Sequence, residues 1–299
     1  MKTYRFGIVG LGVMGREMAD LLAAHPRFSV AAGFDPARPQ VSFPQLPSAE
    51  AVIADPAVDA VYTATPPRVH EEVVRLAARH RKPILCEKPL AHSIASARAC
   101  RDIAAEAGIP AAVNFSFAAR DVALRLGYVV ASGQLDHLTG ISLRARFAQW
   151  PRSWQSGAGA WLAGAEEGGF TREVVSHYIF LANRLFGPGK LQKALVTRPA
   201  HGTETALVAE ISHGDLVFHL DAAIGGDRDD DIRFAVTGSR GEAAIVDWQH
   251  LEFTGEAGPH YPASAPLDHL ALLLDGKPNH LATLDEGLAV VELIEAMLA

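Results

Sequence analysis

The sequence predicts an α/β protein with an N-terminal doubly wound parallel sheet and a C-terminal α+β domain built on an antiparallel sheet. Three observations support this prediction. The chain has 299 residues, 49% of them hydrophobic, which is enough for two cores of ordinary size. Its first 115 or so residues alternate short apolar runs with helical patterns, and the rest contains longer alternating segments joined by short turns. We expect two domains, residues 1–117 and 118–299.

Five strands are expected in the first half, and nearly all their residues are apolar. This composition is typical of a parallel sheet that helices cover on both faces. The strands are expected at residues 4–9, 28–34, 58–64, 83–86 and 110–114. Helical spacing occurs between them, at residues 13–25, 68–80 and 93–108. Alternation of strand and helix with this short period predicts a doubly wound sheet.

The second half has a different pattern of secondary structure. Short turns at 213–215 and 239–241 join consecutive alternating segments, which indicates antiparallel hairpins. Helices are expected at 121–132 and 171–186, and Thr283 to Glu286 forms a capping box that opens a last helix to about residue 298. The acidic run 227–231 is interpreted as a solvated turn between strands. The expected strands cover residues 139–148, 205–212, 216–224, 232–237 and 242–248.

Composition excludes several classes of protein. There are 27 lysines and arginines against 34 acidic residues, a net charge of −7, and no basic block suited to nucleic acid. No stretch approaches the roughly 20 apolar residues of a membrane helix. Two cysteines, Cys86 and Cys100, are too few for a disulfide framework, which suits a cytoplasmic protein. The glycine-broken start does not resemble a secretion signal, and no histidine cluster has metal-ligand spacing.

A glycine-rich motif follows the first expected strand. Gly10, Gly12 and Gly15, with Val13 and Met14 between them, form G-x-G-x-x-G at the start of a helix. Asp35 ends the next strand, 20 residues after Gly15. The helix N-terminus would offer N–H groups to phosphates, and Asp35 would accept hydrogen bonds from ribose hydroxyls. The alternative is a glycine-rich turn that binds no nucleotide.

Arg38 bears on the choice of cofactor. It lies three residues after Asp35, where it could stack on adenine or meet a 2′-phosphate, although a solvated loop arginine is the commoner case. The carboxylate of Asp35 would repel a 2′-phosphate. The sequence therefore favours NAD, with use of NADP not excluded.

Two further strand ends carry candidate residues. Glu87 and Lys88 follow the fourth strand, where ligands of doubly wound sheets lie. A partly desolvated lysine beside a positively charged nicotinamide could exchange a proton, whereas the alternative is a surface Glu–Lys pair. Thr65 and Pro66 end the third strand and could form a rigid turn against the cofactor. His70 follows them, and on its own is better interpreted as a solvent-facing histidine.

The stretch 167–187 is the distinctive part of the second half. Gly168 and Gly169 permit close approach of backbone or ligand just before a helix. Glu173 and His177 are four residues apart and share one helix face, so the carboxylate could orient the imidazole for acid–base chemistry. The alternative is an ordinary helix-surface Glu–His pair.

Together these motifs resemble the glucose–fructose oxidoreductase / inositol dehydrogenase / MocA (Gfo/Idh/MocA) family of NAD(P)-dependent oxidoreductases. The resemblance implies an N-terminal Rossmann domain and a C-terminal domain with a large open, mostly antiparallel sheet. It also implies that Lys88 and His177 form the catalytic pair, with Glu173 where the family usually has aspartate. It further implies a homo-oligomer, a dimer or tetramer, formed through the open sheet face. The matching segments are GLGVMG at 10–15, Asp35, TPPRVH at 65–70, CEKPLA at 86–91, EGGFTREVVSHYIF at 167–180 and the residues 272–296.

This chain departs from the family pattern at several positions. Pro67 replaces an asparagine, Leu162 follows Trp161 where arginine is frequent, and Val175 and Phe180 stand where glycine and aspartate are frequent. Fewer polar groups thus remain for a sugar or cyclitol. The side chains considered for substrate contacts are Arg120, Trp154, Trp161, Arg172 and Tyr178.

The sequence hypothesis is an oxidoreductase that transfers hydride between a nicotinamide and a CH–OH or C=O carbon of a small polar substrate. Lys88 would stabilise the alkoxide and take up or relay the hydroxyl proton. His177 would hold the hydroxyl and help with proton transfer, steadied by Glu173. The alternative is a cofactor-binding sensor of the same fold without turnover. We also expect the strands at 205–212, 216–224 and 232–237 to expose a broad face of apolar and small residues.

Overall fold

The computed structural model describes residues 2–155 and 160–299 and divides the chain into two compact units. The first contains residues 1–115 and 266–291, and the second contains 116–265 and 292–299. This differs from the two continuous domains predicted from sequence. The chain passes from the first unit to the second between residues 115 and 116, close to the predicted boundary. Residues 266–291 then return to the first unit, where Leu267 and Leu270 join its hydrophobic core.

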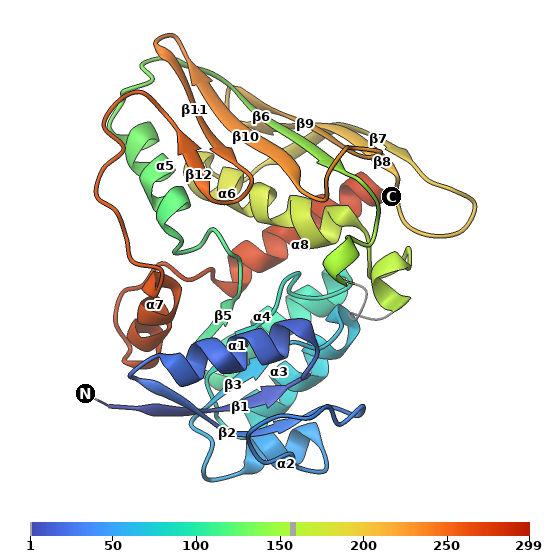
Figure 1. The fold of residues 1–299 in the computed structure, drawn as a ribbon, viewed down its shortest axis with the longest axis vertical. Coiled ribbons are helices and arrows are strands. Elements are labelled where there is room, and N and C mark those ends of the chain that lie inside the picture. Colours follow the sequence, from blue (N-terminus) through green and yellow to red (C-terminus); the bar gives the residue numbers. More distant parts are fainter. Residues whose placement is uncertain (1, 156–159) are drawn as a thin grey trace. The chain divides into compact units, whose positions relative to one another are not determined.

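The first unit contains a parallel five-stranded sheet in the order β2-β1-β3-β4-β5 (Figure 1). The expected doubly wound sheet is thereby confirmed. The sheet order reverses at β1, so the carboxyl ends of β1 and β3 lie side by side at the position where ligands of such sheets bind. The strands are β1 (Tyr4–Val9), β2 (Phe28–Phe34), β3 (Ala60–Thr63), β4 (Ile84–Cys86) and β5 (Ala111–Val113).

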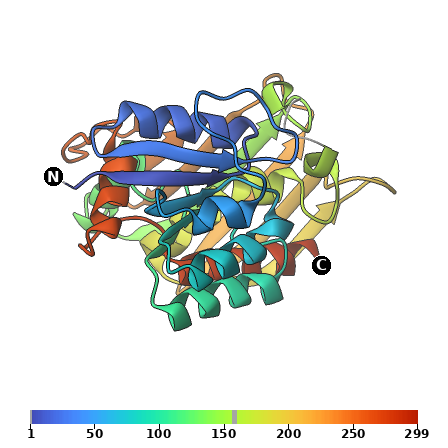
Figure 2. The same cartoon turned by 90° about the horizontal axis from the view of Figure 1, so that it is seen from below.

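Helices cover both faces of this sheet. Figure 2 shows α1 on one side and α3 and α4 on the other. The helices are α1 (Val13–Ala24), the short α2 (Ala49–Ala54), α3 (His70–Arg79) and α4 (Ile94–Ala107), with α7 (Ala265–Leu274) arriving from far along the chain. Both α2 and α7 escaped prediction. Tyr4 binds this returning segment, since its hydroxyl donates to Leu274 O (2.9 Å) and Asp275 Oδ1 (2.8 Å).

The second unit contains a seven-stranded sheet in the order β12-β11-β10-β6-β9-β8-β7. Every neighbouring pair is antiparallel except β6 with β9, which confirms the mostly antiparallel sheet and both expected hairpins. The strand β7 escaped prediction because it is an edge strand that is largely exposed on both faces and so lacks an alternating pattern. The strands are β6 (Leu138–Phe147), β7 (Lys190–Thr197), β8 (Ala206–His213), β9 (Leu216–Ile224), β10 (Asp231–Gly238), β11 (Gly241–Val246) and β12 (His250–Glu252).

Helices α5 (Asp121–Ala131) and α6 (Ser176–Phe186) pack on one face of this sheet (Figure 1). The helix expected over 171–186 begins with a π-helical turn at Thr171–Val175, a feature found preferentially at functional sites. The last helix, α8 (Leu284–Leu298), begins at the predicted capping box: Glu286 N–H donates to Thr283 Oγ1 (3.2 Å), and Thr283 N–H donates to Glu286 Oε2 (2.8 Å).

The other face of the seven-stranded sheet differs from the expectation of an apolar surface. Val208 and Leu195 are exposed, at 47% and 72%, but ion pairs cross the same face. They join Lys193 to Glu210, Arg146 to Asp221 and Arg144 to Asp231, at 2.5–2.8 Å. The face therefore combines apolar patches with a row of opposite charges on neighbouring strands.

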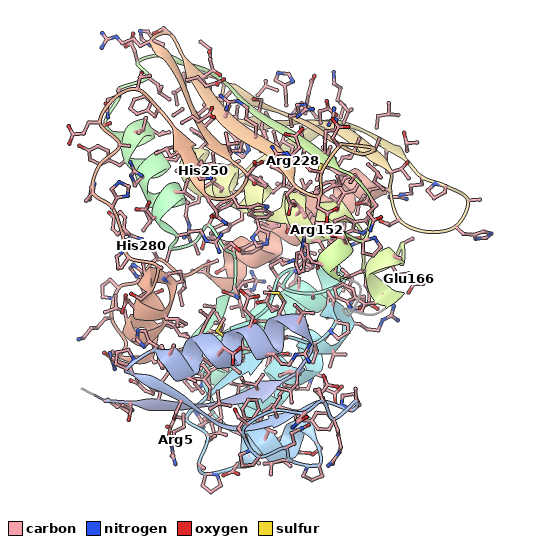
Figure 3. All side chains as sticks on the ribbon, in the orientation of Figure 1. Arg5, Arg152, Glu166, Arg228, His250 and His280 are labelled. Carbon is pink, nitrogen blue, oxygen red and sulfur yellow. The ribbon has the colours of Figure 1, made fainter. Side chains whose placement is uncertain are left out.

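The acidic run 227–231, expected as a solvated turn, also forms ion pairs and a hydrogen bond with other segments. Asp230 pairs with Arg152 at 2.9 Å, and Asp229 accepts a hydrogen bond from Ser153 N–H at 3.1 Å. Arg228 pairs with Asp247 at 2.6 Å. Figure 3 shows Arg152 and Arg228 in the same part of the second unit. The run thus fixes the segment around residue 152 and the turn after β11.

Candidate functional site

The glycine loop after β1 has the geometry of a phosphate-binding turn. Gly10 has φ +90°, and a Cβ there would lie 2.6 Å from Ala64 O, so only glycine fits. At Gly15 a Cβ would lie 2.0 Å from Gly10 O, which enforces close packing of α1 on the loop. Gly12 has no atom within 4 Å of the Cβ position, so its backbone stays open to an outside group.

The first turn of α1 can receive an anion. Gly12 caps the helix without a side-chain hydrogen bond, and no acidic residue occurs in the first turn. The backbone N–H groups and the positive dipole end at Val13 and Met14 are therefore available to a pyrophosphate. Met14 is 39% exposed, in keeping with a turn that faces outward. The loop fits the dinucleotide predicted from sequence.

Asp35 is anchored beside this loop. Leu11 N–H donates to Asp35 Oδ2, and Ala37 N–H donates to Oδ1, both at 2.8 Å. Each carboxylate oxygen retains a further lone pair for a ribose hydroxyl. Arg38 is exposed at φ +48° in the turn that follows. The predicted arrangement of glycine loop, acidic residue and loop arginine is present.

His70 differs from the prediction of a solvent-facing side chain. It is fully buried, and its ring nitrogens contact Thr65 O (2.9 Å) on one side and Pro89 O and Leu90 O (both 3.2 Å) on the other. The imidazole thus connects the turn after β3 to the turn after β4. Thr65 is partly buried and Pro66 is exposed in the first of these turns.

Glu87 is the centre of a buried network under Lys88. Its Oε1 accepts hydrogen bonds from the Tyr62 hydroxyl and from Asn114 Nδ2, both at 2.6 Å, and its Oε2 accepts from Lys88 N–H at 3.2 Å. Burial raises the pKa of the Glu87 carboxyl and that of the Tyr62 phenol. The side chain of Glu87 fixes the strand end that carries the partly buried Lys88, and its predicted contact with cofactor stays a prediction. Asn114, which the sequence analysis missed, directly follows β5 at the same edge of the sheet.

In the second unit, His177 is oriented by the backbone. It is only 4% exposed, and Ser116 N–H donates to its Nδ1 at 3.2 Å. Since Nδ1 accepts this bond, the neutral ring carries its proton on Nε2. Glu173 is partly buried one turn earlier, and its predicted role in steadying His177 stays a prediction.

The glycine pair before this helix accommodates a distant carboxylate. Gly169 has φ +101°, and a Cβ there would lie 2.4 Å from Glu204 Oε2. Glu204 is 2% exposed, and its Oε1 accepts a hydrogen bond from Thr171 N–H at 2.8 Å. A negative charge thus caps the start of the helical segment that carries His177. No local pattern could have indicated Glu204, which comes from the loop between β7 and β8.

The side chains considered for substrate contacts differ in their burial and in their partners. Arg172 is buried and paired with Glu295 through both Nε and Nη2, while its Nη1 donates to Ala165 O and Gly168 O. It therefore has a structural role instead of a substrate role. Arg120 is exposed at the start of α5, Trp161 is partly buried, and Trp154 is half exposed beneath the Arg152 guanidinium.

Tyr178 is fully buried, and its hydroxyl has no hydrogen-bond partner within residues 2–155 and 160–299. Burial raises the pKa of this phenol well above its usual range. Val175 and Phe180, the two departures from the family pattern on this helix, are also fully buried. They belong to the core of the second unit.

Within the described parts of the chain, no group of three or more His, Cys, Asp or Glu side chains could hold a metal ion. None of the helices that the structure describes is long and apolar enough to cross a membrane.

The fold and the glycine loop together define a Rossmann domain of the NAD-binding type. Residues 4–115 match the family described as "Oxidoreductase family, NAD-binding Rossmann fold", the Gfo/Idh/MocA family. The match covers the five strands of the first unit and shows that this part of the chain is an NAD-binding Rossmann domain. NAD is accordingly the cofactor of this domain, and the roles of the glycine loop and Asp35 in holding it stay predictions.

Relatives and solved structures agree with this assignment. The chain is 35% identical over 106 residues to inositol 2-dehydrogenase of Mycolicibacterium smegmatis, covering 32% of this chain and 31% of that protein. It is 31% identical over 106 residues to 2,7-anhydro-N-acetylneuraminate hydratase of Escherichia coli, covering 32% of this chain and 28% of that protein. The alignments thus span less than a third of these relatives' lengths.

The likeness of fold extends further than the likeness of sequence. The WlbA dehydrogenase of Bordetella pertussis, solved with NADH and UDP-GlcNAcA, has a TM-score of 0.84 and 20% identity to this chain. The match covers 99% of this chain and 95% of that one, so the second unit also shares the fold of such proteins.

Proposed function

We propose that this protein is an NAD-dependent dehydrogenase or reductase acting on a CH–OH or C=O carbon of a small polar substrate, a sugar, polyol or related compound. Inositol 2-dehydrogenase, a relative over the first unit, acts on a substrate of this kind by its name. When bound, NAD supplies the hydride acceptor or donor at the nicotinamide C4.

A series of contacts between neighbouring turns of the first unit supports this proposal. Gly10 lies against Ala64 and Thr65, Thr65 O contacts His70, and His70 contacts Pro89 O beside Lys88. The cofactor loop and the turn of Lys88 are therefore parts of one rigid set of strand ends. A buried histidine that joins two such turns keeps a lysine at a fixed place relative to the cofactor loop, as acid–base chemistry requires.

Lys88 is assigned the proton transfer. In the oxidation direction its neutral amine would take the hydroxyl proton, and the resulting ammonium would stabilise the negative charge on the substrate oxygen. The Tyr62–Glu87–Asn114 network would hold the backbone of Lys88 in place without touching the substrate.

His177 is assigned the positioning of the substrate oxygen. With Ser116 N–H on Nδ1, its neutral ring presents Nε2–H as a donor and cannot serve as a proton acceptor there. It would hold the hydroxyl or carbonyl oxygen by donating a hydrogen bond. In the catalytic pair that the family resemblance implies, Lys88 would thus transfer the proton and His177 would position the substrate oxygen.

Two measurements test the proposal. Nicotinamide fluorescence on mixing with NADH should show binding, and a screen of polyols, sugars and 2-oxo or imino acids should show NADH formed or consumed at 340 nm. NADH binding without turnover of any compound would indicate the sensor alternative. Turnover of a substrate without net change in NADH would point instead to chemistry like that named for the hydratase relative.

We also propose that the protein forms a homo-oligomer through the open face of the seven-stranded sheet and works in the cytoplasm. The exposed Val208 and Leu195 on that face support association, and the free thiols of Cys86 and Cys100 suit a reducing compartment. Sedimentation that finds only a 31.9 kDa species at micromolar concentration would contradict the oligomer.

A further inference from the structure

Trp248 occupies a backbone position that disfavours a bulky side chain. It lies in the turn between β11 and β12, the hairpin whose far side begins at His250, labelled in Figure 3. Asp247 and Trp248 have φ +47° and +70°, the left-handed region that glycine and asparagine prefer in tight turns. Such a conformation is strained for a non-glycine residue. We therefore expect the indole to make contacts that compensate for this backbone strain.

The indole is placed against the candidate catalytic histidine. Its ring meets His177 edge to face, with centroids 5.2 Å apart and planes at 85°. It also stacks on Phe117 at 5.5 Å and contacts Tyr178 at 5.3 Å. Phe117, His177 and Tyr178 are 1%, 4% and 0% exposed, whereas Trp248 is only partly buried. In this four-ring cluster, Trp248 is the member that a molecule outside the protein can reach most readily.

We propose that Trp248 determines substrate specificity by supplying an aromatic wall beside His177 for a cyclic polyol, pyranose or cyclitol. A ring of this kind presents a face of C–H groups to the electron-rich face of an indole. His177 Nε2–H would meanwhile donate to one ring hydroxyl. The proposal deepens the function proposed above and rests on it.

The hydroxyl of Tyr178 supports a polar ligand at this cluster. The Tyr178 ring lies next to the indole, with centroids 5.3 Å apart, and its hydroxyl has no hydrogen-bond partner within the described residues. Leaving a buried hydroxyl unpaired costs free energy, which a hydrogen bond to a ligand hydroxyl would recover. An aromatic wall with a neighbouring unpaired hydroxyl is suited to a molecule that has both C–H faces and hydroxyls. An acyclic polyol has no persistent C–H face and should gain less.

The test compares a ring with its open-chain counterpart. 1,5-Anhydro-D-glucitol and D-glucitol carry similar hydroxyls, but only the first is cyclic. In Trp248→Ala the KM for the cyclic compound should rise by about tenfold or more, with less than about threefold change for the acyclic one and for NAD. Trp248→Phe, which restores an aromatic face, should return the KM of the cyclic compound to within about threefold of the wild type.

A matched control separates backbone strain from ligand contact. Arg81 is exposed at φ +53° in the turn after α3, so Arg81→Gly relieves the same kind of strain in the first unit, whereas the aromatic cluster belongs to the second. It should leave all three KM values unchanged. A Trp248→Ala variant that lowers the melting temperature but keeps the KM of the cyclic compound would show that the indole serves packing alone, and would overturn the proposal.

Binding without turnover distinguishes the two proposals. Calorimetry of 1,5-anhydro-D-glucitol in the presence of NADH should show binding to the wild type that weakens in Trp248→Ala. If binding of this compound weakens in Trp248→Ala but the wild type converts neither it nor any compound of the screen, the proposal of the aromatic wall holds and the dehydrogenase proposal fails. If conversion occurs and Trp248→Ala changes the KM of both polyols equally, only the proposal of the aromatic wall is wrong. Absence of both binding and conversion would also overturn the wall.

Discussion

The two units build their candidate sites in opposite ways. In the first unit, every candidate group follows a parallel strand, so the order of strands in the sheet places the groups at one edge. In the second unit, His177 depends on Ser116, Glu204 and Trp248, which come from three separate segments. A parallel sheet converts positions in the sequence into positions at one edge, whereas an antiparallel sheet with long loops does not. The strand-end residues of the first unit are Gly10, Asp35, Thr65, Glu87 and Asn114.

The largest expected effect tests whether the strand-end residues act in chemistry. Lys88→Met keeps most of the side-chain volume and removes the charged donor. It should lower turnover by roughly 10²–10⁴ with little change in NADH binding, the usual scale for loss of an acid–base group. Steady-state kinetics and NADH fluorescence provide the measurements.

His177→Asn is the companion variant in the second unit. An asparagine Oδ1 could still accept the Ser116 N–H, so the fold should persist while turnover falls less than in Lys88→Met. If both variants keep full activity per folded molecule and only the melting temperature moves, the two residues serve packing and the catalytic assignment is wrong.

The same contrast explains what the sequence could predict. The parallel sheet, the glycine loop, the strand-end position of Lys88 and the capping box at Thr283 all follow from local patterns. The burial of His70 does not, because its partners Pro89 and Leu90 are about 20 residues away. Glu204 lies in a loop whose sequence resembles any polar connection. The alternating pattern predicts Trp248 at the end of the strand 242–248, whereas β11 ends at Val246 and Trp248 lies in the turn that follows. Their roles depend on tertiary contacts that no local pattern encodes.

The next largest effect concerns the distant cap of the second unit. Glu204→Ala leaves the Thr171 N–H buried without its acceptor and should lower the free energy of unfolding by about 1–3 kcal/mol. Chemical denaturation measures this change. Asp215→Ala, in the exposed turn between β8 and β9, is the control and should change it little. Equal effects of the two variants would show that the cap does not stabilise the helical segment of His177.

A smaller effect is expected on cofactor preference. Asp35→Ser, with Arg38 kept, removes a charge that opposes a 2′-phosphate and should shift preference toward NADP by about 1–2 kcal/mol. The readout is the ratio of NADPH to NADH dissociation constants, because loss of the bonds to Leu11 and Ala37 would weaken both cofactors alike. Asp35→Asn, which keeps one acceptor oxygen, should shift the ratio in the same direction. A wild type that already binds NADPH more tightly than NADH would contradict the assignment of Asp35.

The smallest effect tests one contact between the first unit and the segment that returns to it from far along the chain. Asp275 accepts hydrogen bonds from Arg27 Nη2 and the Tyr4 hydroxyl, both at 2.8 Å, and these donors hold the pKa of its carboxyl well below the usual range. The folded protein therefore binds this proton less readily than the unfolded chain does. The stability gained is fully present above the unfolded pKa, about 4, and is lost as the pH falls toward the lower folded value. Melting temperatures of wild type and Asp275→Asn should thus differ most near neutral pH and converge on acidification below about pH 4. Asp285→Asn, whose side chain is 74% exposed, should follow the wild type throughout. A gap between wild type and Asp275→Asn that stays constant from pH 7 to pH 3 would mean that packing, and not the charge of Asp275, holds the returning segment against β1 and β2.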